Sequence, residues 1–281
     1  MSDVSVIIPA LNEEIHVRRA VSSALPLGRV VVVDGGSRDR TKELATQAGA
    51  EVIEHSWTGY AAQKNWALAN VEPSAEWVLF LDADEYLTPA LSEEIASSTR
   101  AGAFDGFYIP RRNIFLGRVL RHAWWYPDYQ LRLFRAGRGR YENRLVHEHV
   151  VLDGKTGFLN EPIMHENLKG IDAFVERHLR YAALEAEEML RARAHASGDR
   201  RSGRLLGSWP DRRRALKVHV WYRLPARPAI RFLWMYLIKC GFLDGKEGRL
   251  YCQLIAAQEA LINAKLLELE RHGGRRSTGR D

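Results

Sequence analysis

The chain has 281 residues, of which 46% are hydrophobic and 27% are charged, and a formal net charge of +6. These values are ordinary for a globular protein with one large domain or a domain and an appendage. The longest apolar patch, residues 230–243, is interrupted by Arg231 and Lys239, which excludes a bilayer-spanning helix. Cys240 and Cys252 lack C-x-x-C spacing, so we expect buried thiols in a reducing compartment.

The first half of the chain alternates predicted strands with predicted helices. Apolar runs predict strands at 4–9, 30–34, 51–55 and 77–81, and helical periodicity predicts helices at 17–25, 41–48 and 60–70. Asn12 is expected to cap the first helix. This alternation predicts a parallel, doubly wound α/β sheet. Right-handed crossovers would place the loops at Asn12, Asp34 and Asp82 on one edge of that sheet. We expect no secretory signal, because a strand follows Met1 almost at once.

The second half of the chain follows a different pattern. A helix is predicted from Thr88, then strands at 106–110 and 129–135 with an aromatic loop at 122–128 between them. A long amphipathic helix from Ile171 and helices at 229–242 and 248–270 are predicted next. Residues 273–281 contain no apolar side chain and are expected to be disordered.

Two carboxylates follow the most apolar of the predicted strands. Asp82 and Asp84 come directly after the run 77–81, where open α/β sheets bind ligands. Carboxylates at positions i and i+2 repel each other unless a proton or a cation lies between them. Mg²⁺ and Mn²⁺ prefer such oxygen ligands and often bridge to substrate phosphates. The alternative is an acidic turn without a ligand.

Other loops of the first half suit a nucleotide, although neither G-x-G-x-x-G nor a P-loop is present. Asp34 ends a predicted strand and could accept a hydrogen bond from a ribose hydroxyl or a base, or it could be a turn residue. Gly35 and Gly36 would allow close backbone approach. Lys64 could neutralise a diphosphate, or it could be a solvated helix lysine.

Three segments in this order resemble the signature of the family 2 glycosyltransferases of the GT-A fold: Pro9-Ala10-Leu11-Asn12-Glu13-Glu14, residues 33–39 and Leu81-Asp82-Ala83-Asp84-Glu85. Residues 63–65, 146–148 and 241–245 further resemble the WaaE-like lipopolysaccharide core β-1,4-glucosyltransferases. The resemblance implies an α/β GT-A fold, a doubly wound mixed sheet with a C-terminal helical extension. Residues 1–170 would form the catalytic domain, with a nucleotide-sugar half (1–100) and an acceptor half (101–170). Residues 171–272 would form the helical region, and 273–281 the tail.

The resemblance also implies an inverting, metal-dependent transfer of a hexose, with glucose favoured. The donor would be a UDP-sugar, and the acceptor a lipid-linked, lipopolysaccharide core or related cell-surface glycan. Asp84 would ligate Mg²⁺ or Mn²⁺, together with Asp82, and His165 would be a further ligand or merely a packed histidine. The residues that would bind the nucleotide sugar are Pro9, Ala10, Asn12, Glu14, Asp34, Gly35, Lys64, Asp82 and Ala83.

The catalytic base is the least determined part of the site. Inversion needs a carboxylate that takes the proton of the acceptor hydroxyl. We favour Glu148, with Asp128 as the second candidate, and Glu85 and Glu166 behind them. Glu148 could instead form an ion pair with Arg132 or Arg144. Tryptophans 124 and 125 and Tyr126 could stack on sugar rings or pack the loop.

The last third of the chain interleaves basic and aromatic residues. Arg212, Arg213 and Arg214 lie close in sequence to Trp209 and Trp221. This composition favours contact with an anionic membrane, and a solvated helix face or an oligomer interface is the alternative. No nucleic-acid motif is present, so no nucleic-acid partner is expected. We therefore expect a cytoplasmic protein, peripheral on the inner membrane. A catalytically silent glycan-binding protein and a sugar-nucleotide pyrophosphorylase are the alternative functions.

Overall fold

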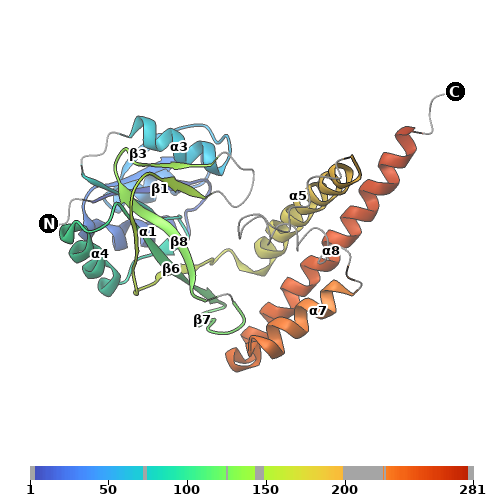
Figure 1. Ribbon diagram of the computed structural model, residues 1–281. Helices are drawn as coiled ribbons and strands as arrows, with labels where there is room; N and C mark the ends of the chain where they lie inside the picture. The colour runs from blue at the N-terminus through green and yellow to red at the C-terminus, as the bar shows by residue number, and fades with distance from the viewer. Residues whose placement is uncertain are drawn as a thin grey trace. The chain divides into compact units, whose positions relative to one another are not determined.

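The computed structural model describes residues 4–71, 75–124, 126–142, 149–198, 224 and 226–277. The chain divides into two compact units (Figure 1). The first unit comprises residues 1–121 and 125–168, and the second comprises 122–124 and 169–281. Each unit has its own secondary structure and core, and each is described separately below.

The parallel part of the sheet in the first unit is built from short apolar strands. These strands are β1 (Val4–Ala10), β2 (Val30–Asp34), β3 (Glu51–Glu54) and β4 (Trp77–Phe80). They are parallel and lie in the order β3-β2-β1-β4. Their carboxyl ends therefore share one edge, as predicted. The strand order changes direction between β1 and β4, and ligands of open α/β sheets bind at such a switch point.

Helices cover both faces of the sheet because β1, β2 and β4 are buried on both faces. On one face lie α1 (Val17–Ala24), the short turn η1 (Leu25–Leu27), α2 (Thr41–Gln47) and α4 (Pro89–Ala101). On the other face lies α3 (Tyr60–Asn70), whose Ala61 and Ala67 pack against Val31 and Val33. Thr88 caps α4, since its Oγ1 accepts a hydrogen bond from the Leu91 amide at 3.2 Å.

The rest of the sheet makes it mixed rather than purely parallel. It contains β5 (Glu85–Tyr86), β6 (Gly106–Phe115), β7 (Arg118–Val119), β8 (Asp128–Arg135), β11 (Thr156–Phe158) and β12 (Ile163–Glu166). The strand β8 runs antiparallel between β4 and β6. Strand β12 runs parallel to β6 and antiparallel to β5. As a result, the start of β8 lies at the edge where β4 ends. A separate ribbon pairs β9 (Gly139–Tyr141) with β10 (Val150–Leu152).

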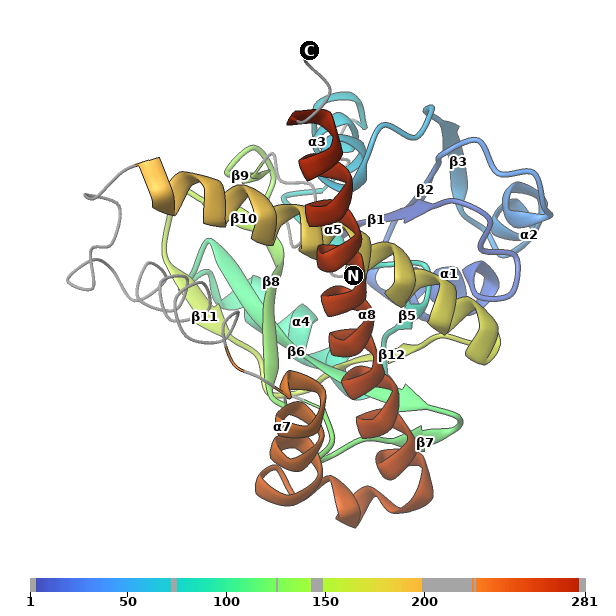
Figure 2. The same ribbon diagram turned by 90° about the vertical axis from the view of Figure 1, so that its right-hand side faces the viewer.

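The second unit is helical. It contains α5 (Gly170–Gly198), α7 (Arg227–Leu233), the π-helical turn η3 (Trp234–Ile238), the 3₁₀ turn η4 (Gly241–Asp244) and α8 (Gly245–Ser277). Figure 2 shows α5 crossing α8, and α7 running beside α8. The α5–α8 core consists of Ala182, Ala186, Met189, Ile262 and Leu266. None of the described helices combines the length and apolar character that a membrane span requires.

Three sequence predictions about local structure are wrong. Asn12 does not cap α1, whose N-cap residue is His16. Asn12 has φ +55°, and its Oδ1 accepts from the Arg38 amide instead. The helix predicted at 229–242 ends at Ile238, because Cys240 adopts φ +56°, outside the helical region. The helix α8 continues to Ser277, into the tail predicted to be disordered, since a formed helix extends at little cost per residue.

Candidate active site

Asp82 lies at the end of β4 among positively charged side chains. Its carboxylate oxygens are 2.7 Å from Arg132 Nη2 and 3.3 Å from Lys64 Nζ. Arg132 comes from β8, and Lys64 comes from α3 on the second face of the sheet. Burial opposes the ionisation of Asp82, but the charges of Arg132 and Lys64 hold its pKa well below the usual range. Asp82 is therefore a fixed anion, and its side chain remains one-third exposed.

Glu85 contacts both members of the ion pair between Asp82 and Arg132. Its side chain is 1% exposed, and its Oε2 accepts a hydrogen bond from the Asp82 amide at 3.0 Å. Its Oε1 is 3.4 Å from Arg132 Nη2. Burial raises the pKa of Glu85 despite the opposing charge of Arg132. Burial would lower the pKa of Arg132, yet Asp82 and Glu85 raise it well above its ordinary value.

Asp84 faces a different set of groups. Its Oδ2 lies 3.2 Å from His165 Nε2 and accepts a hydrogen bond from Asn167 Nδ2 at 3.1 Å. His165 reaches this position because β12 pairs with β5, with His165 opposite Glu85. Burial alone would raise the pKa of Asp84, but the charge and hydrogen bond of His165 lower it below its ordinary value. Asp84 and His165, both predicted to lie at the metal site, are thus in contact although they are 81 residues apart in the sequence.

The donor atoms around Asp84 could supply part of the ligand shell of a divalent cation. A carboxylate oxygen and an imidazole nitrogen converge there, and Asp82 supplies a second carboxylate two residues away. No group of three or more His, Cys, Asp or Glu able to hold a metal occurs within the part of the chain that the structure describes. Mg²⁺ typically takes one or two carboxylates and completes its shell with water and substrate phosphates. The residues present therefore suit a cation that is held jointly with a diphosphate.

The loop after β2 contains a buried carboxylate with unused hydrogen-bonding capacity. Asp34 is fully buried, and its Oδ2 accepts from the amides of Gly36 and Ser37 at 2.9 and 2.8 Å. Its Oδ1 has no hydrogen-bond partner among the described residues. An unsatisfied buried carboxylate oxygen is costly unless a ligand donates to it. The predicted role of Asp34 in binding a nucleoside is compatible with this arrangement.

Two other residues predicted to bind the nucleotide sugar, Asn12 and Glu14, accept hydrogen bonds from the protein backbone. Asn12 Oδ1 accepts from the Arg38 amide at 2.9 Å, and Glu14 Oε2 accepts from the Arg40 amide at 3.1 Å. Gly35 packs beneath Trp57, which would lie 3.2 Å from a Cβ at that position. These side chains hold the loops after β1 and β2 together. Pro9 and Ala10 lie in β1 beside β2, and Ala83 is buried between the two aspartates.

Gln63, Lys64 and Asn65 project from α3 toward three different elements. Gln63 hydrogen-bonds His55 at the end of β3, at 2.8 Å. Asn65 accepts from and donates to the backbone of Tyr141 in β9, at 2.8 and 2.9 Å. Lys64 alone points to the carboxylates, and its side chain is 6% exposed. Lys64 is thus a buried cation of the site rather than a solvated helix lysine.

Of the four base candidates, Asp128 belongs to the network around Asp82. Its Oδ2 is 2.8 Å from Arg111 Nη2 and 3.2 Å from Gln130 Nε2, and Gln130 in turn accepts from Arg132. The side chain of Asp128 is 28% exposed. Glu85 is fully buried, which leaves no room for an acceptor hydroxyl.

The remaining two base candidates are less informative. Glu166 forms an ion pair with Arg19. Glu148 and its possible partner Arg144 lie outside the described residues.

Sequence analysis missed the two arginines that organise the site and one buried aspartate. Arg132 lies inside the predicted strand 129–135, where a charged residue was the available signal, and Arg111 directly follows the predicted strand 106–110. Asp244 is 2% exposed, and its Oδ2 accepts hydrogen bonds from the amides of His122 and Ala123 at 2.8 and 2.7 Å. Asp244 therefore holds the first part of the aromatic loop within the second unit.

The aromatic loop itself is partly packed. The Trp124 ring lies 5.5 Å from that of Tyr251 of α8, centroid to centroid. The Tyr126 hydroxyl accepts from Arg112 Nη2 at 2.9 Å. Trp124 thus fits the packing alternative, and Trp125 lies outside the described residues.

Several known proteins are similar to this chain in sequence. The model of "Glycosyl transferase family 2" matches residues 5–153. The lipopolysaccharide core biosynthesis glycosyltransferase LpsC of Rhizobium meliloti is 29% identical over 270 residues, which cover 91% of each protein. An uncharacterized glycosyltransferase of Rickettsia typhi is 26% identical over 282 residues, covering 96% of this chain and 88% of that protein.

Among solved structures, glucosyl-3-phosphoglycerate synthase from Mycobacterium tuberculosis, in complex with Mn²⁺, UDP and glucosyl-3-phosphoglycerate, is 24% identical with a TM-score of 0.34. That match covers 41% of this chain and less than half, 45%, of the synthase, which is too little to compare the two sites.

The family match covers more than half of the chain and includes the loops after β1, β2 and β4. Together with the mixed sheet and the long C-terminal helix, it confirms the predicted GT-A fold. It also confirms the predicted enzyme class. The chain belongs to glycosyl transferase family 2.

Proposed function

We propose that this glycosyltransferase moves a hexose, with glucose favoured, from a UDP-sugar to a lipopolysaccharide core or related cell-surface glycan, with inversion and with a divalent cation. One observation carries the proposal. Asp84 and His165 lie within hydrogen-bonding distance of each other, two residues from Asp82, which is ion-paired with Arg132 at the switch point of the sheet. The similarity to LpsC over 91% of both chains supports the class of acceptor.

The donor would occupy the edge between the loops after β1, β2 and β4. The unpartnered Oδ1 of Asp34 would accept a hydrogen bond from the nucleoside. Arg132 Nη1 is also buried without a partner among the described residues, and it lies next to Asp82. Arg132 and Lys64 together would offset part of the negative charge of the diphosphate, because charges interact strongly in a partly buried site.

The carboxylates divide into a metal-binding group and a base. Asp84 and His165, with Asp82 nearby, would hold Mg²⁺ or Mn²⁺. The cation would supply positive charge for the diphosphate as it leaves. Asp128 would accept the proton of the acceptor hydroxyl while that oxygen attacks the anomeric carbon from the face opposite the leaving group.

Asp128 is preferred as the base because Gln130 links its carboxylate to Arg132, the partner of Asp82. Arg111 and Gln130 fix one of its oxygens, and its partial exposure gives an acceptor access to the carboxylate. Glu148, which the sequence favoured, becomes the second candidate.

The proposed acceptor is anchored in a lipid, so the enzyme would work on the cytoplasmic face of the inner membrane as a peripheral protein. The oligomeric state is no part of this proposal.

The test is a donor and cation screen followed by a transfer assay. UDP- and GDP-sugars are tested by thermal shift with and without Mn²⁺, and the stabilising donor is then supplied with a lipopolysaccharide core acceptor. We expect a UDP-sugar to raise the Tm only when Mn²⁺ is present, and the product to carry one added hexose. Equal stabilisation by UDP-sugars with and without the cation would contradict the metal-dependent part of the proposal.

A further inference from the structure

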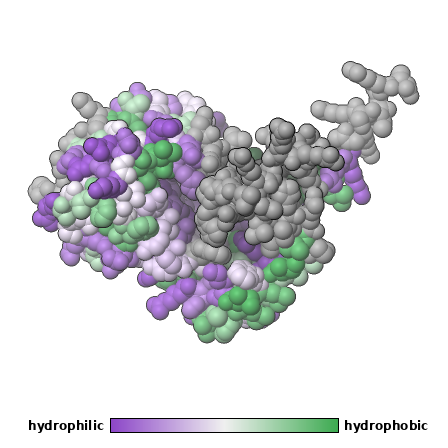
Figure 3. All heavy atoms as spheres, in the orientation of Figure 1, coloured by the Kyte–Doolittle hydropathy of each residue, from purple (hydrophilic) through white to green (hydrophobic). Residues whose placement is uncertain are grey.

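The second unit exposes a continuous group of large apolar side chains. They lie on α7, η3 and η4, and each has between 44% and 64% of its surface exposed: Leu233, Trp234, Leu237, Ile238, Phe242 and Leu243. We name this group the apolar corner. Figure 3 shows hydrophobic residues gathered at the lower edge of the molecule, where Figure 1 draws these helices in orange. Soluble monomers rarely expose contiguous apolar patches of this kind without a function.

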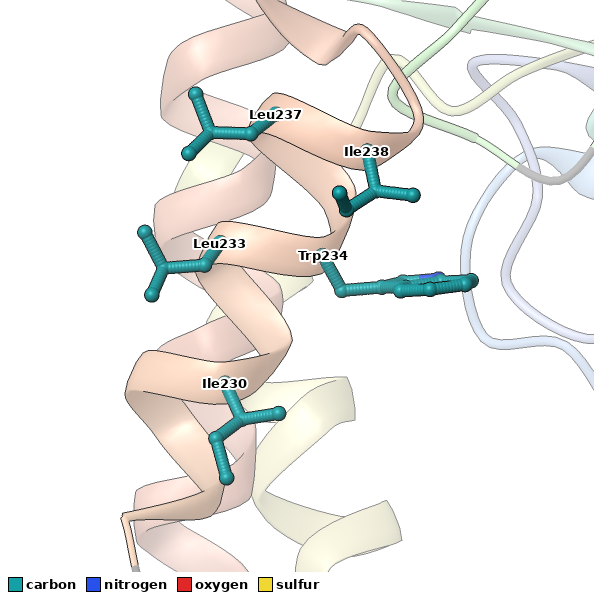
Figure 4. Close-up of a pocket in the computed structure, with 5 residues that line it drawn as sticks. All are labelled: Ile230, Leu233, Trp234, Leu237 and Ile238. Atoms are coloured by element: carbon teal, nitrogen blue, oxygen red, sulfur yellow. The ribbon is translucent and has the colours of Figure 1, made fainter.

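The local geometry explains why these side chains face outward. Leu233 and Leu237, like Trp234 and Ile238, are spaced by four residues and so lie on one side of the helix. Figure 4 shows Leu233 and Leu237 projecting from one side of the helix and Trp234 and Ile238 from the neighbouring side. Met235, between them in sequence, is 8% exposed and packs inward. The inner face of the segment is therefore already used, and the outer face is a second apolar surface.

The corner is shallow and entirely apolar. Ile230, Leu233, Trp234, Leu237 and Ile238 line a depression of about 260 Å³. At η4 the group continues through Phe242, whose ring packs edge-on against Tyr236, with a centroid distance of 6.1 Å. Trp and Tyr prefer the boundary between water and hydrocarbon, because their rings are apolar and their N–H and O–H groups are polar.

Basic residues accompany the corner. Residues 227–250 contain five basic and two acidic side chains, and one of the basic ones, Arg227, is 1% exposed and lies 3.8 Å from Glu259. One of the two acids, Asp244, is buried and binds backbone amides. The other, Glu247, is half-buried and lies 3.8 Å from Lys246, whose own side chain is 92% exposed. Arg249, near the start of α8, is exposed as well. The exposed charge next to the corner is thus positive.

We infer that the apolar corner is a membrane-docking surface that inserts into the interfacial layer of a bilayer rich in anionic lipids. Apolar side chains enter the boundary between headgroups and acyl chains, while exposed cations pair with lipid phosphates. The charge next to the corner favours an anionic bilayer over a second copy of this chain, whose own corner would bring like charges together. The inference rests on the proposed function only in that a lipid-anchored acceptor needs an enzyme at the same surface.

The first experiment measures co-sedimentation of the full chain with phosphatidylglycerol-containing vesicles and with phosphatidylcholine vesicles. We expect binding to the anionic vesicles, weakened by salt. The double variant Leu237→Glu/Ile238→Glu should lower the bound fraction at least about tenfold, because two charges replace inserted apolar groups. The matched control is Leu267→Glu, at a position on α8 that is 50% exposed but outside the corner. It should bind as the unaltered chain does.

Equal vesicle binding by the double variant and the unaltered chain would overturn the inference. So would a dimer in sedimentation velocity that the double variant converts to a monomer, since a second copy would then cover the corner. If the double variant does not fold, brominated lipids decide the question. They should quench the fluorescence of the unaltered chain more than that of Trp234→Phe, and equal quenching would overturn the inference.

The docking surface and the proposed function can fail separately. Transfer to a lipid-free acceptor fragment should be unchanged in the double variant. A chain that transfers sugar but binds no vesicles would refute the docking surface alone. A chain whose vesicle binding depends on the corner but that turns over no UDP-sugar would refute the proposed function alone.

Discussion

The edge of the sheet around Asp82 and the apolar corner around Ile238 differ in their side-chain environments. Around Asp82 every carboxylate named above has a cationic or amide partner within 3.4 Å, and Glu85 and Arg132 are buried. At the apolar corner, large hydrocarbon side chains are at least 44% exposed. The first region holds charge in a fixed arrangement, and the second holds apolar surface in contact with water.

This difference separates two consequences of mutation. Removing a group from the charged region should change the chemical step, since fixed charges there act on the reacting groups. Changes in the helical unit should alter stability, loop position or surface binding, and leave the chemical step nearly intact. The predictions below test that separation, beginning with the largest effect.

Asp84→Ala should abolish cation-dependent transfer, lowering kcat/KM by about 10²-fold or more, because it removes the carboxylate placed against His165. Steady-state kinetics with Mn²⁺ varied over a wide range would measure the effect. The exposed Glu93→Ala on α4 is the matched control and should retain full activity. An Asp84→Ala variant with normal kinetics would remove Asp84 from the metal site.

Asp128→Asn should lower kcat by about 10²-fold or more while donor binding persists, because the amide cannot take a proton. Its Oδ1 or Nδ2 can still contact Arg111 or Gln130, so the fold should survive. Glu148→Gln, measured in parallel, should have a much smaller effect. The opposite ranking of the two variants would transfer the base role to Glu148.

Asp244→Ala should lower the free energy of unfolding by about 1–3 kcal/mol, because two buried amides lose their acceptor. The released His122–Trp124 segment should also raise the KM for the acceptor more than it lowers kcat, since Asp128 follows this segment in the chain. Urea unfolding and acceptor kinetics measure the two effects. Asp244→Asn, which retains one acceptor oxygen, should restore part of the stability, and no recovery would argue against the hydrogen bonds as the cause.

Lowering the pH should reduce the contribution of the Asp82 ion pair to the free energy of unfolding. The pKa of Asp82 is held below its ordinary value by Arg132 and Lys64, so the unfolded chain takes up a proton before the folded chain does. The stabilisation is complete above the ordinary aspartate pKa of about 3.9 and is lost as the pH falls below it. Urea unfolding should show a gap between the unaltered chain and Asp82→Asn that is constant above about pH 5 and shrinks progressively as the pH falls below about 4. A gap that does not change with pH would contradict the ion pair.

The two cysteines should react differently, which is the smallest predicted effect. Burial, followed by the charge of Asp244, raises the pKa of the Cys252 thiol to about 11, and Cys252 is fully buried. Cys240 is partly exposed. Iodoacetamide should therefore modify Cys240 in the folded protein and Cys252 only after unfolding, as mass spectrometry can show. Rapid modification of Cys252 in the folded chain would mean that the packing beneath the apolar corner is open.

The sequence supported the parallel half of the fold because apolar runs such as residues 30–33 are buried on both faces and end in polar loops. It also pointed to Asp34, Asp82 and Asp84, whose positions follow from where strands end, and to Lys64 within α3. The pairing of β12 with β5, which carries His165 to Asp84, depends on contacts far apart in sequence and has no local signal. Arg111 and Arg132 stand out locally only as charges in or beside apolar strands, and their partners appear only when β6 and β8 lie side by side.

The most direct test of the account is Mn²⁺ binding followed by electron paramagnetic resonance, with and without UDP. The arrangement of Asp84 and His165 predicts that the unaltered chain lowers the free Mn²⁺ signal below that of Mn²⁺ and UDP without protein, and that Asp84→Ala causes no such further fall. If the unaltered chain causes no fall beyond that of UDP alone, or if Asp84→Ala causes the same further fall, the central claim is wrong.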